Sequence, residues 1–289
     1  MEKENKKSSK KEDIPWHTAF FEAIQMELDE YSQDLHFTSE FPLNTQPLKI
    51  DVVIIKKTRD IAIDKNIASI FRKENIVEYK SPKDYVSVRD FYKVYGYACL
   101  YSSLNKVDVK DMTLIFIESH YPRELLAHLR EVRGYTVEEK LPGIYIVSGD
   151  ILPIQIIDSR KLSEEENIWL KDLYNKLDVA EMQRITTEIT MLDKDKAARI
   201  KAYFDVIARA NDKSFEEVIK MSDGALRFEK VFEEVGWIAK WEARGIAVGE
   251  AKGRAEGMLE VARKMKNAGR PLSEIMEFTG LPAESIEQI

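Results

Sequence analysis

Hydrophobic positions along the chain follow two different periods, and the period changes once, near Ser159. Before that point, short β-branched and aromatic runs of strand length stand between stretches with helical spacing. After it, apolar residues recur only at helical spacing. The early pattern predicts strands over Phe37–Leu43, Leu48–Ile55, Asn75–Lys80, Met112–Glu118 and Ile151–Ile157, a hairpin over Tyr135–Val147, and helices over Trp16–Tyr31, Val86–Tyr101 and Pro122–Arg133.

The second half of the pattern predicts a helical region. The predicted helices cover Leu162–Asp178, Ala180–Met191, Lys194–Ala210, Ser214–Met221 and a stretch from Ala225 onward. The chain is therefore expected to have an α/β domain over residues 14–160, a helical region over 161–236 and a small helical module over 237–289. Residues 1–13 are almost entirely polar and are expected to form a disordered tail.

Composition narrows the class of protein. The net charge is −7 and is spread over both halves of the chain, so a nucleic-acid site has to be a local patch. The single cysteine, Cys99, excludes a disulfide framework and is expected to lie buried on the apolar face of its helix. No apolar run is long enough to span a membrane, and no secretory signal follows the N-terminal lysines. These features predict a soluble cytoplasmic protein without membrane contact.

Charged residues interrupt two of the buried strand runs. Asp51 lies in the second predicted strand, and Glu78 and Lys80 lie in the third. Side chains two residues apart in a strand share one face, so Glu78 and Lys80 are expected to point together. If the two strands are neighbours, Asp51 can lie opposite Glu78, and the two carboxylates can share a divalent cation. The alternative is that Glu78 and Lys80 face water on an edge strand while Asp51 caps a turn. The sequence pattern alone leaves both interpretations open.

The order of elements and the charged trio resemble a known family. An αβββαβ core with an acid on the second strand and E-x-K on the third is similar to the PD-(D/E)XK nuclease superfamily. Within it, two stretches resemble bacterial recombination-promoting nuclease and putative transposase proteins: IFRKENIVEYKSPKDYVSVRDFYKVYGYACLY, and GIAVGEAKGRAEGMLEVARKMKNAG with the following FTGLPAESIEQI. Together with the first helix and the strands, the resemblance covers most of the chain.

The resemblance implies a restriction-endonuclease-like fold with a mixed sheet and a site that binds Mg²⁺ or Mn²⁺. It implies that Asp51 and Glu78 hold the metal and that Lys80 assists the attacking water. Glu22, on the first helix, matches an acid that many members place near the metal. On the helix after the E-x-K strand, Lys93 and Tyr97 are the polar residues that could support the site, although a solvated helix face explains them better.

The function implied by the resemblance is that of a metal-dependent DNA phosphodiesterase acting in recombination, transposition or phage defence. The competing interpretation is a catalytically inactive nuclease fold that serves as an interaction module for DNA or protein.

The segment between Asp51 and Glu78 is long and basic. It is expected to contain a short helix over Lys65–Lys73 and to lie beside the proposed site, where its cations could contact phosphates. With one residue from the following helix, the candidate DNA contacts are Lys56, Lys57, Arg72, Lys73 and Lys93.

Four glycines recur every four residues near the C-terminus, at Gly245, Gly249, Gly253 and Gly257. Each costs a helix roughly 1 kcal/mol relative to alanine, so a compensating contact is expected. A groove of small residues lets a second helix approach closely, which predicts a homodimer formed through this helix. A flexible connector is the alternative. The short helices that follow resemble a helix-turn-helix, but their acidic residues favour a packing or protein-interaction module.

Overall fold

The computed structural model of the chain describes residues 14–39, 52–221, 257–282 and 286. The chain divides into two compact units, residues 1–225 and residues 226–289. The change from mixed to all-helical sequence near residue 160 therefore falls inside the first unit. The predicted glycine-rich helix lies outside the described residues, apart from Gly257.

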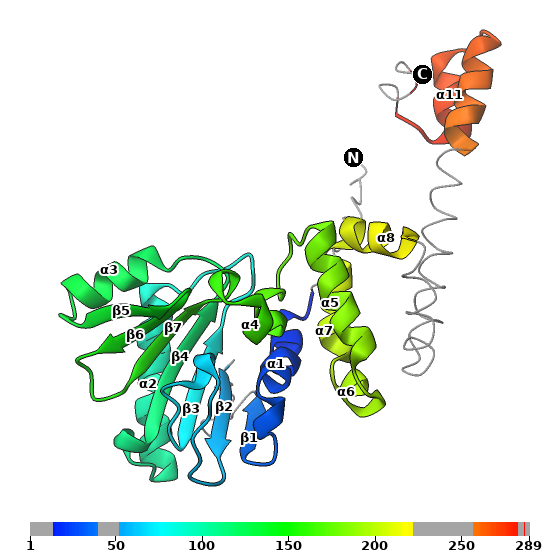
Figure 1. The fold of residues 1–289 in the computed structure, drawn as a ribbon. Coiled ribbons are helices and arrows are strands. Elements are labelled where there is room, and N and C mark those ends of the chain that lie inside the picture. The colour runs from blue at the N-terminus through cyan, green and yellow to red at the C-terminus, as the bar shows by residue number, and fades with distance from the viewer. Residues whose placement is uncertain (1–13, 40–51, 222–256, 283–285, 287–289) are drawn as a thin grey trace. The chain divides into compact units, whose positions relative to one another are not determined.

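The first unit is built on one mixed sheet of seven strands, in the order β1-β2-β3-β4-β7-β6-β5 (Figure 1). The pairs β3·β4 and β4·β7 are parallel, and the other four pairs are antiparallel. The α/β class with a mixed sheet is thus confirmed. The strands are β1 Leu35–Ser39, β2 Val52–Lys57, β3 Glu74–Tyr79, β4 Met112–Glu118, β5 Thr136–Leu141, β6 Ile144–Ser148 and β7 Ile154–Asp158.

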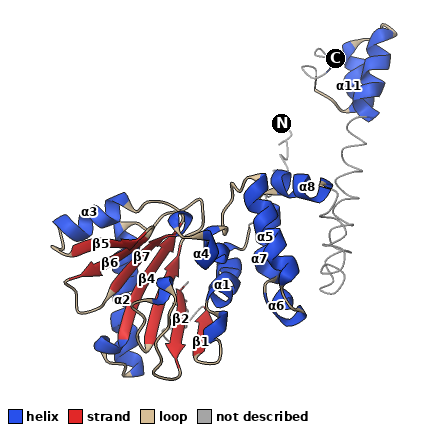
Figure 2. Cartoon of the chain, in the orientation of Figure 1, coloured by secondary structure: helices blue, strands red, loops and turns tan. Residues whose placement is uncertain are grey.

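Helices cover both faces of this sheet (Figure 2). Helices α2 and α3 pack on the face that carries Ile76, Leu114 and Ile154, in one buried apolar cluster. Helix α1 packs on the other face, where its Phe20 ring stacks on Tyr79 at 4.4 Å. The helices are α1 Trp16–Glu27, α2 Val88–Asn105, α3 Arg123–Glu131, α4 Glu164–Lys171, α5 Val179–Met191, α6 Lys194–Arg199, α7 Lys201–Ala210, α8 Asp212–Lys220 and, in the second unit, α11 Leu272–Thr279.

Two predicted helices and one predicted buried residue need correction. The predicted helix over Lys65–Lys73 is a single 3-10 turn, Asn66–Ala68. The helix predicted over Lys194–Ala210 breaks at Ile200, so that α6 and α7 are separate. Cys99 is exposed, because the buried face of α2 is formed by other positions, three or four residues apart: Phe91, Val94, Ala98 and Tyr101.

A buried acid on α1 joins this helix to α4. Asn167 has a non-helical backbone (φ −138°, ψ 41°), which interrupts the hydrogen bonding within α4. The Leu170 N–H instead donates to Glu27 Oε1 at 2.9 Å, and Lys65 pairs with the other carboxylate oxygen at 3.1 Å. Both oxygens of this buried carboxylate are therefore satisfied, and the first helix of the chain is held to a helix that follows the sheet.

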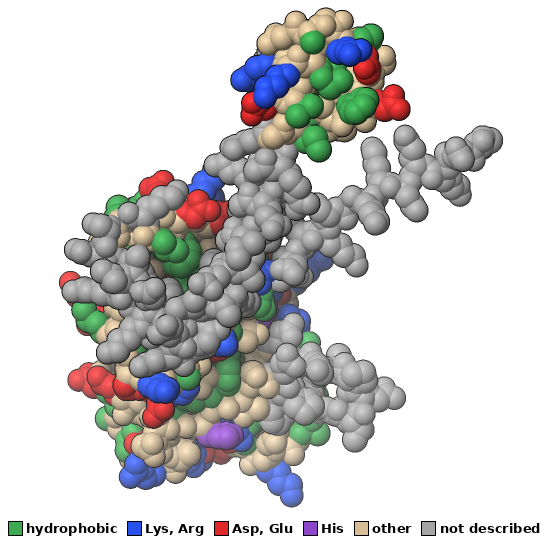
Figure 3. Space-filling view, turned by 90° about the vertical axis from the view of Figure 1, so that its right-hand side faces the viewer, with side chains coloured by type: hydrophobic (Ala, Val, Ile, Leu, Met, Phe, Trp, Pro, Cys, Tyr) green, Lys and Arg blue, Asp and Glu red, His purple; other side chains and the backbone are tan. Residues whose placement is uncertain are grey.

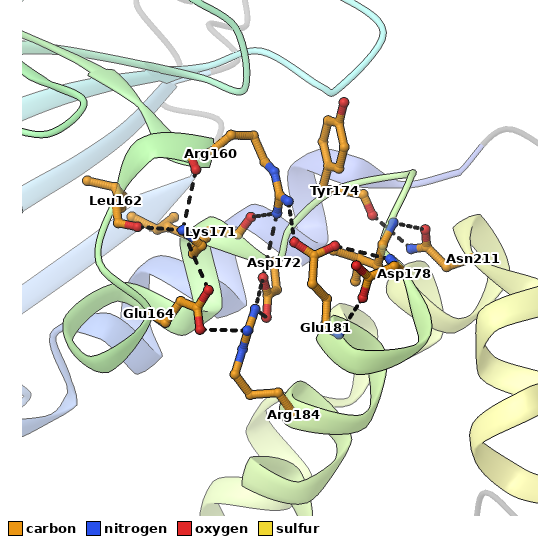
Figure 4. A network of polar contacts seen from close by, with 12 residues as sticks. Arg160, Leu162, Glu164, Lys171, Asp172, Tyr174, Asp178, Glu181, Arg184 and Asn211 are labelled. Atoms are coloured by element: carbon orange, nitrogen blue, oxygen red, sulfur yellow. Dashed lines mark hydrogen bonds and ion pairs between the residues drawn. The ribbon is translucent and has the colours of Figure 1, made fainter.

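A second buried acid, Asp172, joins the sheet to α5 (Figure 4). Both of its oxygens accept hydrogen bonds from Arg184 at 3.0 Å, and Arg160, just after β7, lies 3.6 Å away. Burial raises the pKa of Asp172 to about 6, while the two arginines act in the opposite direction. Arg160 also pairs with Glu181 of α5 at 2.5 Å. The network explains why the helices after residue 160 belong to the same compact unit as the sheet.

The second unit has a small core of its own. Helix 257–267 and α11 enclose Ala262 and Ile275, with Ile286 against them. Gly280 ends α11 in the left-handed conformation (φ 66°), a backbone state that glycine adopts without strain. Figure 3 shows hydrophobic side chains among charged ones on the surface of this unit. The large hydrophobic side chains exposed among its described residues are Met258, Val261, Leu272, Met276 and Phe278.

None of the described helices is both long and apolar enough to cross a membrane.

Two glycines give a matched test of this fold. Gly143, in the β5–β6 turn, has φ +78°, and a Cβ there would lie 2.5 Å from the Asp158 carbonyl oxygen. We expect Gly143→Ala to lower the free energy of unfolding by about 1–3 kcal/mol. Gly96, inside α2, leaves open space around a Cβ, so Gly96→Ala should raise stability by about 0.5–1 kcal/mol. Urea unfolding of the two variants measures both changes. Equal effects of the two substitutions would contradict the described turn.

Candidate functional site

Glu78 lies on the penultimate position of β3 with its side chain on the face covered by α2. Its neighbour Tyr79 points to the opposite face, toward α1, as the two-residue period requires. Glu78 is only 2% exposed. Its Oε1 lies 3.3 Å from Lys80 Nζ and 3.6 Å from Lys93 Nζ. The structure therefore brings together three of the predicted residues: Glu78, Lys80 and Lys93.

The second carboxylate oxygen of Glu78 has a different environment. Glu78 Oε2 is buried, and no described residue donates a hydrogen bond to it. Burial raises the pKa of Glu78, while Lys93 and Lys80 act in the opposite direction. A buried carboxylate oxygen without a partner is costly, so the site favours a ligand that could approach this atom.

Asp90 holds the ammonium group of Lys80 in place. Lys80 Nζ donates to Asp90 Oδ1 at 2.8 Å and also lies 3.9 Å from Asp84. Burial alone would lower the pKa of Lys80, but the hydrogen bond with Asp90 and the contact with Glu78 outweigh it and raise that pKa. A lysine with a raised pKa stays protonated at neutral pH. In this arrangement Lys80 suits stabilisation of negative charge better than proton abstraction.

Asp90 lies in the first turn of α2, and the capping contacts of this helix fix its position. Ser87 and Asp90 form a capping box: the Asp90 N–H donates to Ser87 Oγ, and the Ser87 N–H donates to Asp90 Oδ2, both at 3.1 Å. Hydrogen bonds from Lys80 and Ser87 outweigh the effect of burial and lower the pKa of Asp90 to about 2. Asp90 was not among the residues predicted from the sequence, although the S-x-x-D spacing at the start of an apolar helix is a signal for a capping residue there.

A further buried acid, Glu118, lies at the end of β4. The Val86 N–H donates to Glu118 Oε2 at 3.2 Å, whereas Glu118 Oε1 is buried without a partner among the described residues. Burial, opposed by the Val86 hydrogen bond and reinforced by nearby Asp158, raises the pKa of Glu118 to about 8. The β3·β4 register continues with Lys80, whose N–H donates to the Ile117 carbonyl at 2.9 Å. Glu118 therefore ends the strand directly beside the site.

Asp51 lies outside the described residues, so its distance from Glu78 stays a prediction. The register does show which residue faces Glu78 across the antiparallel pair: it is Val52, a buried apolar residue. Asp51 is the residue expected opposite Glu78; in the described pairing Val52 holds that position, and where Asp51 itself lies stays a prediction. Among the described residues, no group of three or more His, Cys, Asp or Glu side chains is placed to hold a metal ion.

Glu22 is on α1, and its carboxylate contacts the start of α7, away from Glu78. Its Oε2 accepts the Tyr203 N–H at 2.6 Å, in the first turn of α7, where backbone N–H groups lack helical acceptors. Helix α1 covers the sheet face that carries Tyr79, whereas Glu78 points to the other face. The contacts of Glu22 are those of a helix cap.

Four of the five candidate DNA contacts also lie elsewhere. Lys56 pairs with Glu74, at the first residue of β3, four residues before Glu78 and therefore about 13 Å along the strand. Lys57 pairs with Asp60, Lys73 pairs with Asp111, and Arg72 donates to the Lys110 carbonyl. The basic segment is thus at the opposite end of β3 from the site. Lys93 is the exception, while Tyr97 packs against the apolar cluster under α2.

The chain matches no model of a known protein family, no curated protein and no solved structure.

The position of Glu22 gives a test by pH. Burial raises the pKa of this carboxyl to about 7, from 4.5, even though the Tyr203 and Ala202 N–H groups act against the rise. The folded chain therefore holds this proton more tightly than the unfolded chain, and the stability that the neutral form provides is lost as the pH rises from about 4.5 through 7. We expect Glu22→Gln, which keeps an oxygen acceptor, to be more stable than the wild type at pH 8, with a smaller difference at pH 5.

Thermal unfolding at the two pH values measures this difference. Glu188→Gln, at an exposed position of α5, is the control and should change stability little at either pH. A Glu22→Gln variant whose stability relative to the wild type is the same at pH 5 and pH 8 would contradict the raised pKa of Glu22.

Proposed function

We propose that this chain is a metal-dependent DNA phosphodiesterase of the PD-(D/E)XK type, with its site at Glu78 and Lys80. The observation that carries the proposal is the buried carboxylate of Glu78: one oxygen faces two ammonium groups, and the other has no partner among the described residues. A carboxylate in this state destabilises a fold unless a ligand compensates for it. Perturbed acids of this kind are typical of functional sites.

The residues present fit a hard divalent cation such as Mg²⁺ or Mn²⁺. A free carboxylate oxygen is the ligand type that Mg²⁺ prefers, and Glu78 Oε2 provides one. Asp51, one residue before the strand position opposite Glu78, is the second ligand that the family resemblance implies. A cation bound there supplies Lewis-acid stabilisation of phosphate oxygens and lowers the pKa of a bound water.

The chain's own side chains have separate tasks in this proposal. The Lys80 ammonium stabilises the negative charge that develops on the phosphate during in-line attack by water. Asp90 positions Lys80 through the 2.8 Å hydrogen bond. Lys93, which is 41% exposed, neutralises Glu78 from the solvent side and can contact a neighbouring phosphate.

A second interpretation rests on the same ion pairs. Glu78, Asp84 and Asp90 surround Lys80, so the cluster could serve only to hold β3 against the start of α2. In that case the chain is a non-catalytic interaction module with a nuclease-like core. Substitution of Lys80 would then change stability but no reaction.

A plasmid-nicking assay separates the two interpretations. The wild type should convert supercoiled plasmid to the nicked form with Mg²⁺ and not with EDTA. Lys80→Ala and Glu78→Gln should each reduce the rate on the order of 100-fold or more, because the first removes the ammonium group that stabilises the transition-state charge and the second removes the carboxylate that would hold the cation. Circular dichroism of both variants shows whether they remain folded.

Lys110→Ala is the matched control. Lys110 is exposed, pairs with Asp108 and precedes β4, at the other end of the sheet from Lys80. Its substitution should leave nicking unchanged. A wild-type chain without Mg²⁺-dependent nicking, or a folded Lys80→Ala variant with the wild-type rate, would refute the catalytic proposal.

A further inference from the structure

Exposed tyrosines lie at the carboxyl-terminal edge of the sheet, where the parallel strands β3 and β4 end. Tyr85, in the loop after β3, is 57% exposed, and Tyr121, in the loop after β4, is 46% exposed. Among the Phe, Trp and Tyr side chains in the described part of the first unit, the other exposed one is Tyr92, on α2. These exposed rings are accessible to a ligand. They lie where ligands of open α/β sheets bind, outside the carboxyl ends of the strands.

One hydrogen bond brings the two loops together. Val86, next to Tyr85, donates its N–H to Glu118 at the end of β4. Tyr121 follows Glu118 by three residues, so their Cα atoms are at most about 11 Å apart. The two tyrosines therefore flank the same strand end, next to the Glu78 and Lys80 cluster.

Cations accompany these rings. Lys161, in the 3-10 turn after β7, places its Nζ 4.8 Å from the centre of the Tyr121 ring and 3.1 Å from the Tyr145 hydroxyl. The Tyr121 and Tyr145 rings are 5.8 Å apart. Lys161 is 46% exposed, and Lys93, beside Glu78, is 41% exposed. Aromatic rings and cations thus occur together along the ends of β3, β4 and β7.

We propose that this edge, formed by Tyr85, Tyr121, Lys93 and Lys161, binds an unpaired strand of DNA. Bases stack on the open tyrosine rings, and phosphates lie near the two lysines, as in sites for single-stranded nucleic acid. In a duplex the faces of the bases are already stacked on one another and cannot reach a ring. Lysines alone would bind the phosphates of single-stranded and duplex DNA alike. The exposed tyrosines therefore favour the single strand. The inference rests on the proposed function for its location beside a cleavage site, but the binding itself needs no catalysis.

Fluorescence anisotropy in EDTA tests the inference with the full-length chain. The probes are a labelled single strand of mixed sequence and the same strand annealed to its complement. The wild type should bind the single strand more tightly than the duplex. Tyr85→Ala and Tyr121→Ala should each weaken single-strand binding about 10-fold, and Tyr85→Phe should restore it, because stacking needs the ring and not the hydroxyl.

Leu104→Ala is the control. Leu104 is 59% exposed and lies near the far end of α2, about 16 Å along the helix from Lys93, so its loss should leave binding unchanged. Equal affinity of the wild type for both probes, or wild-type affinity in both alanine variants, would overturn the inference.

The two proposals can fail separately. A chain that prefers the single strand through its tyrosines but nicks no plasmid retains this inference and loses the phosphodiesterase. A chain that nicks plasmid through Lys80 but binds both probes alike loses this inference and retains the phosphodiesterase.

Discussion

The parallel pairing of β3, β4 and β7 is the constraint on which the rest of the first unit depends. Parallel neighbours require crossover connections, and α2 provides the one between β3 and β4. Because the three strands run in the same direction, their carboxyl ends meet at one edge. Lys80, Glu118 and Asp158, distant in the sequence, reach that edge together, with the exposed loops that follow them.

Buried acids occur throughout this unit, and their partners divide them into two kinds. Glu27 and Asp172 have both oxygens matched by N–H groups or cations, and they hold helices to one another and to the sheet. Glu78, Glu118 and Asp158 each retain one buried oxygen without a hydrogen-bond partner among the described residues. Burial of a charge therefore does not distinguish a structural acid from a candidate site. The unsatisfied oxygen does, since the fold gains nothing from it.

The start of α2 links local sequence to the candidate site. The capping box of Ser87 and Asp90 is a short-range feature that satisfies backbone N–H groups of the helix. The same Asp90 carboxylate accepts the hydrogen bond from Lys80. A helix cap thus also determines where the ammonium group of the site lies. The exposed tyrosine loop between Lys80 and Ser87 is held at both ends by these contacts and by the bond from Val86 to Glu118.

The sequence by itself determined the local features. The α/β class, the bounds of β4 and the shared face of Glu78 and Lys80 follow from periods of two and 3.6 residues, which depend only on near neighbours in the chain. Tertiary structure decided the rest: Val52 faces Glu78, Glu22 caps α7, Lys56 lies at the far end of β3, and Cys99 is exposed. A strand pattern does not specify its register, and a helix pattern does not specify what covers each face. Both depend on packing between segments far apart in the sequence.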